Sequence, residues 1–423
     1  MKQAHSILLV LADRSLFPLI ASYQSGLFRD VIPLFKAWEA RSMPTKIASM
    51  RSFLVQAMSA PLLVLHSVIA TDDAHLVDRI FRCTGAKSAT ALDFAAKVGA
   101  LNVVCYLHAT GHGCSTRAMD YAAQNGHAEV LRFLHEHRSE GCSRDAMDFA
   151  AQNGHMDVVQ YLHDVVGVAG TAKALDWAAR NGHIDVLRFL HPRRSEGCTA
   201  YAMDYAAQNG HLEVVELLHG YGAPCSAAAL DMAAANGHIH VVRFLHEHRT
   251  EGATVRALDN AARGGHLPVV IFLHDHRPEG GSTDAIDSAA AHGHDDVVAY
   301  LLAHRRDGWT VRAVDAAAVH GYVPILERLF RADAARAVCS PRGLLHVVQV
   351  AQMESLTWLL ACVPESLAAV ADGLMERAIT HDRIEVVDAL WSAGFYAGVT
   401  PSWLQLAEKT GHEAIVFYLS RLN

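Results

Sequence analysis

The 423-residue sequence lacks the features that mark several common classes of protein. It contains no stretch of about 18 uncharged apolar residues, which a membrane-spanning helix requires. The apolar run at 7–12 is too short for a signal peptide. Basic residues are not in excess, since 36 Lys and Arg stand against 44 Asp and Glu. We therefore expect no membrane or nucleic-acid partner, and a cytoplasmic location with a nuclear one left open.

Motifs that carry chemistry are also missing. The sequence has no paired CxxC, no HExxH, no phosphate-cradling GxxxxGK and no GxSxG. Aromatic residues make up only 7% of the chain, whereas alanine is abundant. The sequence therefore predicts a non-enzymatic protein without cofactor or metal, built from closely packed small helices.

One pattern recurs along most of the chain. The triplet Ala-apolar-Asp returns at steps of 27 or 28 residues, each time followed after one residue by Ala-Ala and preceded five residues earlier by Ser or Thr. The nine Asp residues are Asp93, Asp120, Asp148, Asp176, Asp204, Asp231, Asp259, Asp287 and Asp315. The matching Ser and Thr residues are Ser88, Ser115, Ser143, Thr171, Thr199, Ser226, Thr254, Ser282 and Thr310. A regular period of this length indicates a repeat architecture.

Each repeat predicts a pair of short helices. The Ser or Thr is suited to cap a first helix, because its hydroxyl can accept a first-turn amide. That helix should end at a glycine able to adopt the left-handed conformation, as at Gly126, Gly154, Gly182, Gly210 and Gly237. A second helix follows, with Val130, Leu131, Phe133 and Leu134 on one apolar face. Since one pair cannot bury this face alone, neighbouring pairs must stack.

Four of the eight cysteines occupy the same position in different repeats: Cys114, Cys142, Cys198 and Cys225. Stacking should hold them beyond the roughly 7 Å Cα separation that a disulfide allows, so we expect reduced thiols. Cys114 and Met119 also have the spacing of a hydrophobic staple around the Ser115 cap.

The unit R-A-M-D-Y-A-A-Q-N-G-H-A-E-V-L-R-F-L at 117–134 resembles the ankyrin repeat, whose skeleton is T-P-L-H-x-A-A-x-x-G-H-x-x-x-V-x-x-L-L. Nine such units span 86–330. Asp replaces the familiar His throughout, and the period is shorter than the usual length of about 33, with the loss at the β-hairpin finger. The resemblance implies an all-α, elongated and curved solenoid of helix pairs with little or no β structure.

The flanking segments are less regular. Weaker units at 344–360, 374–390 and 404–419 place divergent repeats and a C-terminal cap in 331–423, and a degenerate repeat is expected at 61–85. Residues 1–60 do not fit the repeat and read as a helical N-terminal cap. Within them, 11–38 is faintly similar to an F-box, with Ile20, Tyr23 and Trp38 near the family spacing. Both interpretations of this segment stay open.

The recurring polar residues favour structural roles. His127 and its equivalents should bond to the adjoining turn, and Asp120 and its equivalents to the neighbouring repeat. The two His of His135-Glu136-His137 point about 200° apart on a helix, which disfavours a shared metal ion. With 28 His in the chain, we also expect acidification from pH 7.5 to 5.5 to weaken stacking.

The resemblance implies that partners meet the first turn and the end of the first helix. The candidate partner-binding residues are Lys97, Arg117, Gln124, Asp145, Gln152, Lys173, Arg180, Tyr201, Gln208, Arg256 and Arg263. An aromatic row follows Asp in the first five repeats and is expected to fill the core with partial exposure: Phe94, Tyr121, Phe149, Trp177 and Tyr205. We expect a monomeric scaffold that binds a protein or peptide; the alternative is an F-box-type substrate receptor of a ubiquitin ligase.

Overall fold

The computed structural model describes residues 65–422 except 67, 85–87 and 194–196. The expected N-terminal cap at 1–60, with its F-box-like segment at 11–38, lies outside the described residues. The described chain forms two compact units, divided between Cys198 and Thr199. The elongated, curved shape and the sequence-based boundaries at 60, 85 and 330 stay predictions.

Both units consist of short helices joined by tight turns. Unit 1 contains α7 (Ala74–Thr84), α8 (Ala91–Val98), α9 (Leu101–Ala109), α10 (Arg117–Gln124), α11 (Ala128–His137), α12 (Arg144–Gln152), α13 (Met156–Tyr161), α14 (Ala172–Arg180) and α15 (Ile184–Leu190). One turn of π-helix, Leu162–Val166, continues α13, and one 3₁₀ turn, His191–Arg193, continues α15. The described residues of this unit include no β-strand, as the shortened period predicted.

Unit 2 continues the same pattern. It contains α16 (Ala200–Gln208), α17 (Leu212–Gly220), α18 (Ala227–Ala235), α19 (Ile239–His248), α20 (Val255–Arg263), α21 (Leu267–His276), α22 (Asp284–His292), α23 (Asp295–His304), α24 (Val311–His320), α25 (Val323–Ala332), α26 (Pro341–Val350), α27 (Met353–Cys362), α28 (Pro364–Ala368), α29 (Ala371–Thr380), α30 (Ile384–Ser392), α31 (Pro401–Thr410) and α32 (Glu413–Leu422). The three divergent C-terminal repeats thus each form a helix pair. Within the described part of unit 2 there is again no strand.

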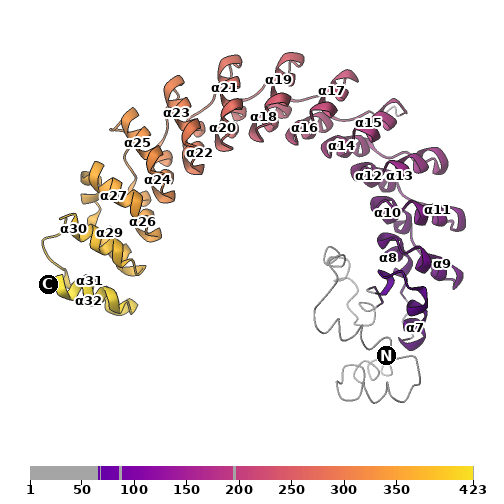
Figure 1. The fold of residues 1–423 in the computed structure, drawn as a ribbon, viewed down its shortest axis with the longest axis horizontal. Coiled ribbons are helices and arrows are strands. Elements are labelled where there is room, and N and C mark those ends of the chain that lie inside the picture. Colours follow the sequence, from indigo (N-terminus) through magenta and orange to yellow (C-terminus); the bar gives the residue numbers. More distant parts are fainter. Residues whose placement is uncertain (1–64, 67, 85–87, 194–196, 423) are drawn as a thin grey trace. The chain divides into compact units, whose positions relative to one another are not determined.

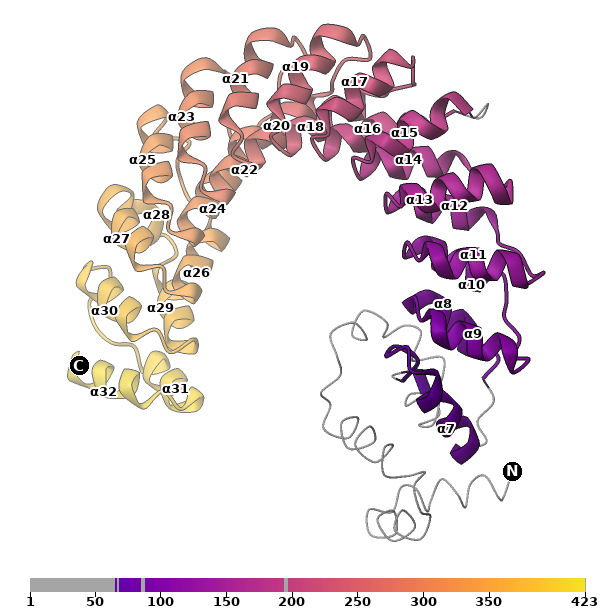
Figure 2. The same ribbon diagram turned by 45° about the vertical axis from the view of Figure 1, so that its right-hand side comes forward.

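Within each unit, the first helices of successive pairs lie side by side in one row and the second helices form another row (Figures 1 and 2). The first helices pack more closely together than the second helices do. Composition explains the difference, because the recurring Ala-Ala pair, such as Ala122 and Ala123, is fully buried and lets backbones approach. Val130, Leu131 and Leu134 fill the space between the rows, whereas Phe133 is only half-buried.

Six of the nine predicted cap residues directly precede their helices, whereas α8, α10 and α22 begin after Thr90, Thr116 and Thr283, so Ser88, Ser115 and Ser282 lie ahead of the N-cap. All nine Ser and Thr hydroxyls accept a hydrogen bond from the amide two residues further along, as Ser143 does from Asp145 at 3.1 Å. α8 begins at Ala91, so the Ser88 hydroxyl lies slightly ahead of its helix and bonds the Thr90 amide at 3.4 Å. These bonds satisfy amides that the first turn leaves without helical partners.

The turn inside each pair requires a left-handed residue. Gly126, Gly154, Gly182, Gly210 and Gly237 have φ between 73° and 79°, which confirms the predicted helix ends. In two of the divergent repeats this place falls to Ala351 with φ 57° and Asp382 with φ 56°, whereas the last one keeps Gly411 with φ 78°. The turn geometry is therefore retained after the glycine is lost.

Candidate functional site

Within each unit, a carboxylate of one repeat binds the cap of the following repeat. Asp120 accepts the Ser143 amide at 2.8 Å and its hydroxyl at 2.9 Å. The same two hydrogen bonds join Asp148 to Thr171, at 2.6 and 2.7 Å, and Asp259 to Ser282, at 2.8 and 2.7 Å. The predicted polar bond between neighbouring repeats is confirmed. It is made by the Asp that stands where the ankyrin skeleton has His.

Burial changes the pKa of these carboxyl groups. Desolvation raises the pKa of Asp93 and of Asp120, although the bonds from Ser115 and Ser143 act in the opposite direction. The buried carboxylates thus serve stacking, and their oxygens are directed at the next repeat. The row supplies alignment between repeats.

The Gly-His residues form a second structural row. Nε2 of His127 donates to the carbonyl of Lys97 at 3.2 Å, and Nε2 of His155 donates to that of Gln124 at 3.1 Å. Each imidazole also covers the turn glycine of the preceding repeat, because a Cβ on Gly126 would lie 2.6 Å from Nδ1 of His155. The predicted bond to the adjoining turn is confirmed for these histidines.

The His-Glu-His segments pack against aromatic rings of the second helices. His137 stacks on Phe133 of its own helix at a centroid distance of 4.4 Å, and His108 of the preceding repeat meets Phe133 edge-on at 5.6 Å. His248 with Phe244, and His276 with Phe272, repeat the stack at 4.4 Å. The part of the chain that the structure describes holds no group of three His, Cys, Asp or Glu placed to bind a metal ion.

The loops contain a further recurring pair. Arg138 bonds Glu140 at 2.6 Å, and Arg249 bonds Glu251 at 2.6 Å, with both guanidinium side chains about 15% exposed. The Arg138 bond lowers the pKa of Glu140. The sequence signal was R-x-E-G before the cap, which the sequence analysis did not interpret.

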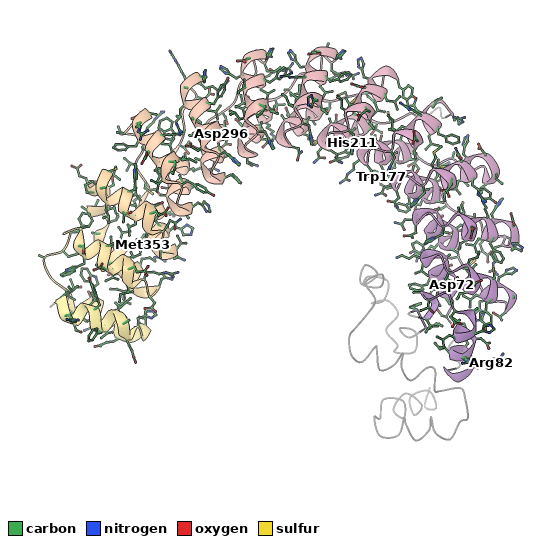
Figure 3. All side chains as sticks on the ribbon, in the orientation of Figure 1. Asp72, Arg82, Trp177, His211, Asp296 and Met353 are labelled. Atoms are coloured by element: carbon green, nitrogen blue, oxygen red, sulfur yellow. The ribbon has the colours of Figure 1, made fainter. Side chains whose placement is uncertain are left out.

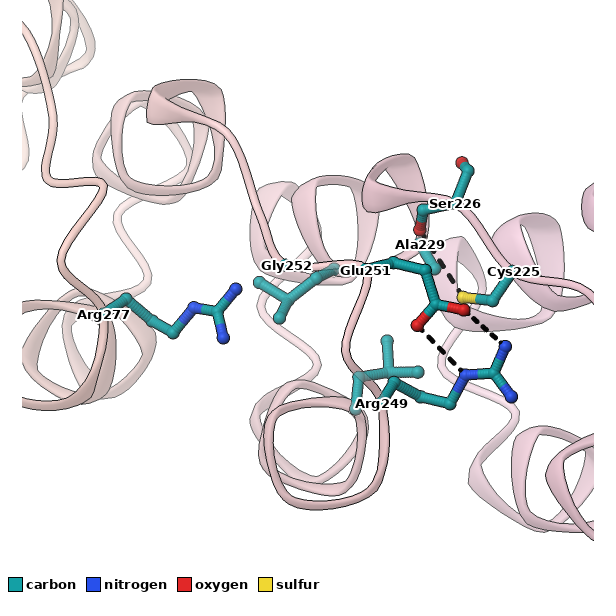
Figure 4. A pocket seen from close by; sticks show the side chains of 9 residues that line it. Cys225, Ser226, Ala229, Arg249, Glu251, Gly252 and Arg277 are labelled. Carbon is teal, nitrogen blue, oxygen red and sulfur yellow. Dashed lines mark hydrogen bonds and ion pairs between the residues drawn. The ribbon is translucent and has the colours of Figure 1, made fainter.

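The pocket around Cys225 in unit 2 encloses about 210 Å³ of space open to solvent (Figure 4). Its lining residues are Cys225, Ser226, Ala229, Leu230, Leu245, Arg249, Glu251, Gly252 and Arg277. The Arg249–Glu251 pair lies inside it, and burial raises the pKa of the Cys225 thiol to about 11. At neutral pH a thiol with so high a pKa is protonated, and a protonated thiol is a poor nucleophile.

The cysteines at the equivalent position behave alike. Cys114, Cys142 and Cys198 are free thiols, and burial raises the pKa of each to about 11. This agrees with the expected reduced thiols. The hydrophobic staple between Cys114 and Met119 stays a prediction.

The aromatic row presents side chains on the first helices of unit 1. Phe94 is completely buried, whereas Tyr121, Phe149 and Trp177 are half-buried, and we call these three the aromatic strip. Phe149 and Trp177 stack at 5.7 Å with a 12° interplanar angle. Figure 3 labels Trp177 on α14, within the row of first helices. The strip is therefore a surface feature as well as packing.

Cations border the aromatic strip. The Lys97 ammonium lies 5.1 Å from the Tyr121 ring centroid, and the Lys173 ammonium lies 5.6 Å from that of Trp177. Burial lowers the pKa of Lys97. Arg117 and Arg144 are exposed on the first turns of α10 and α12. Arg144 was not among the predicted residues, although it precedes Asp145 at an equally exposed first-turn position.

The predicted partner-binding residues divide by exposure and by unit. In unit 1, the exposed ones are Arg117, Asp145, Lys173 and Arg180, and the half-buried ones are Lys97, Gln124 and Gln152. In unit 2, the exposed ones are Tyr201, Arg256 and Arg263, and Gln208 is half-buried. The structure gathers those of unit 1 around the aromatic strip. Those of unit 2 lie among mostly small, uncharged first-helix residues.

Comparison with known protein families identifies the repeat. The family described as "Ankyrin repeats (3 copies)" matches residues 92–173, 119–204, 147–229 and 203–287. No curated protein matches the chain. A solved structure, the pentatricopeptide repeat protein PPR10 from maize, is 13% identical, with 92% of this chain and 77% of that chain covered and a TM-score of 0.30. A score this low supports no conclusion about this protein.

The matched segment contains the whole aromatic strip and most of both structural rows described above. Across the described residues, no helix has the length and apolar character needed to cross a membrane. The family match, the 27–28-residue period and the stacked helix pairs agree. Residues 92–287 are ankyrin repeats of a short form, and the described residues of this segment include no β-strand.

Proposed function

We propose that this protein is a non-enzymatic interaction scaffold, and that a protein or peptide segment binds to the first-helix surface of unit 1, across α10, α12 and α14. Ankyrin repeats generally bind protein partners. The observation that carries the assignment is the aromatic strip, because half-exposed Tyr and Trp with neighbouring cations are the residue types enriched in the energetic centres of interfaces.

The packing of each repeat leaves this surface free to vary. Stacking uses the Asp-to-cap bonds, the Gly-His contacts and the apolar residues between the rows. Arg117, Asp145 and Lys173 occupy the first turns outside all three sets and are exposed. Substitutions there can change the partner without disturbing the solenoid.

Photo-crosslinking of the full chain tests the location. Peptides are first selected from a random display library, and a photoreactive phenylalanine analogue is then placed at Arg117 or Lys173. The controls carry it at Arg132 or Arg188, which are exposed cations on the second helices of the same two repeats. We expect crosslinks from the first-helix positions only. Crosslinks from the second-helix positions, or from neither set, would contradict the proposal.

Trp177→Ala provides an energetic test. Loss of a central aromatic residue should weaken binding of the selected peptides by tenfold or more, corresponding to about 1.4 kcal/mol or more. Circular dichroism of the variant checks that the solenoid is intact. Unchanged affinity in a folded variant would contradict the proposed surface.

A further inference from the structure

We infer that the aromatic strip of unit 1 is specific for an acidic peptide segment, one in which carboxylates alternate with apolar side chains. This inference rests on the proposed function, which places the binding surface, and adds the chemistry of the partner. Three features carry it: the orientation of the rings, the sign of the exposed charges on the first helices, and the buried position of the carboxylates beneath them.

Neighbouring groups lie over rings of the strip. Phe149 and Trp177 are nearly parallel, with ring centroids 5.7 Å apart and a 12° interplanar angle. The ammonium of Lys173 lies over the Trp177 ring and that of Lys97 over Tyr121. Aromatic faces carry negative and edges positive partial charge, so a partner that approaches the edges meets positive potential. Carboxylate oxygens suit these edges, whereas stacking of nucleobases needs open faces.

Exposed charge on the first helices of unit 1 has one dominant sign. Four exposed cationic side chains and the half-buried Lys97 stand there against one exposed carboxylate, Asp145; the exposed cations are Arg117, Arg144, Lys173 and Arg180. The second helices of the same repeats carry the opposite excess, with exposed carboxylates at Glu129, Glu136, Asp157, Asp164 and Asp185. Their exposed cations are Arg132, Arg188 and, in the 3₁₀ turn that continues α15, Arg193. On a chain of net charge −8, the first helices of unit 1 thus form a local basic surface.

The remaining carboxylates of these first helices are already engaged. Asp93, Asp120 and Asp148 are less than 10% exposed, and each accepts two hydrogen bonds from the following cap. Their carboxylate oxygens face the amide and hydroxyl groups of the following cap. A partner above the strip therefore meets the lysines and arginines first, and its carboxylates gain favourable interactions that a neutral segment lacks.

The first helices of unit 2 differ in the placement of aromatic rings and of charged side chains. α18 consists of small and apolar residues apart from the buried Asp231, and Arg312 on α24 is paired with Asp284 at 3.0 Å. In unit 2, Tyr201 and Tyr205 stack on α16, whereas the exposed Arg256 and Arg263 lie on α20. In unit 1, lysine ammonium groups lie over the rings of the strip itself. Specificity for acidic segments is accordingly assigned to α8, α10, α12 and α14.

The test uses full-length protein and fluorescently labelled probes. The probes are a short peptide alternating Glu and Leu, the same peptide with Gln or with Lys in place of each Glu, and single-stranded oligouridylate. Binding is followed by fluorescence anisotropy. We expect the Glu peptide to bind tenfold or more tightly than the Gln peptide, with an affinity that falls as salt rises, because the ions screen exposed charges. The Lys peptide and the oligouridylate should not bind.

Charge reversal supplies the matched variants. Arg117→Glu with Lys173→Glu should reduce affinity for the Glu peptide about tenfold or more and create affinity for the Lys peptide. Arg132→Glu with Arg188→Glu changes the same number of charges on the second helices of the same repeats and should leave both affinities within about twofold. Equal effects of the two double variants would show that net charge alone is responsible and would overturn the inference.

Failure of this inference can be told apart from failure of the proposed function. If Gln and Glu peptides bind alike, or oligouridylate binds more tightly, acidic specificity is wrong. The proposed surface still stands in that case if library-selected peptides crosslink at Arg117 and lose affinity on Trp177→Ala. Absence of crosslinks at Arg117 and Lys173 refutes the surface itself.

Discussion

The Asp120→Ala substitution should cost far more stability than its single carboxylate suggests. In the folded protein, Asp120 accepts both the amide and the hydroxyl of Ser143. Hydrogen bonds to charged groups contribute about 1.5–3 kcal/mol each. Two corrections reduce the sum: burial already disfavours the charged Asp120, as its raised pKa shows, and the half-buried Ser143 can recover part of its bonding from water. We expect a loss of about 2–3 kcal/mol in the free energy of unfolding.

A double-mutant cycle separates this bond from the cap. Ser143→Ala loses the bond to Asp120 and the cap bond to the Asp145 amide, so it should cost about 1–2 kcal/mol. Because both substitutions remove one shared bond, the double variant should be more stable than the sum predicts by about 1–2 kcal/mol. Asp145→Ala, which removes an exposed carboxylate nearby, is the control and should change stability by less than about 0.5 kcal/mol.

The assay is urea unfolding followed by circular dichroism, combined with hydrogen exchange at the first turn of α12. Local exchange is needed because repeat arrays can lose all-or-none unfolding, which makes one global free energy ambiguous. The Ser143 amide should exchange faster in Asp120→Ala and stay protected in Asp145→Ala. A loss below about 1 kcal/mol with no coupling to Ser143 would refute the claim that this row of carboxylates aligns the repeats.

Three further predictions concern turns and pH. Gly126→Ala should cost about 2–3 kcal/mol, against about 1 kcal/mol for Gly141→Ala in urea unfolding, because both have positive φ but only the Cβ at 126 meets the His155 ring; equal costs would disprove the close contact. Ala351→Gly should raise stability by about 1 kcal/mol, since Ala351 already holds a left-handed conformation with φ 57°; a lower melting temperature would contradict this. Burial lowers the pKa of His66 to about 4 from 6.5 and lowers that of His246 and His266. A lowered pKa means that the unfolded chain binds the proton first, so stability is lost as pH falls from 6.5 toward 4, by up to about 3 kcal/mol from His66. His66→Phe should flatten the melting temperature measured between pH 7.5 and 5.5, and an unchanged slope would remove His66 as the cause.

The helix pairs were accessible from the sequence because their determinants are local. A Ser or Thr cap, an Ala-rich first helix and a left-handed glycine act over a few residues, so the pattern at 115–134 predicts its own conformation. Repetition then indicates stacking, since one pair cannot bury the Val130, Leu131 and Leu134 face alone. The sequence also predicted the type of role that the recurring Asp and His play, namely bonds to neighbouring repeats.

The candidate site depended on information that no local pattern contains. Phe94, Tyr121, Phe149 and Trp177 share one position in the repeat, yet Phe94 is fully buried and the other three are partly exposed. The difference arises from what the adjacent repeats place against each ring. The pairing of His137 with Phe133, and of Arg138 with Glu140, likewise became clear only from geometry.

The sequence by itself thus determined the period, the helix pairs, the turns and the ankyrin-like class, because short-range capping and apolar periodicity set these features. Only the tertiary structure decided which oxygen of Asp120 accepts which donor of Ser143, and that the Lys173 ammonium lies over the Trp177 ring. Such contacts depend on the exact offset between successive repeats, a distance of a few ångströms that the one-dimensional spacing of 27 or 28 residues does not specify.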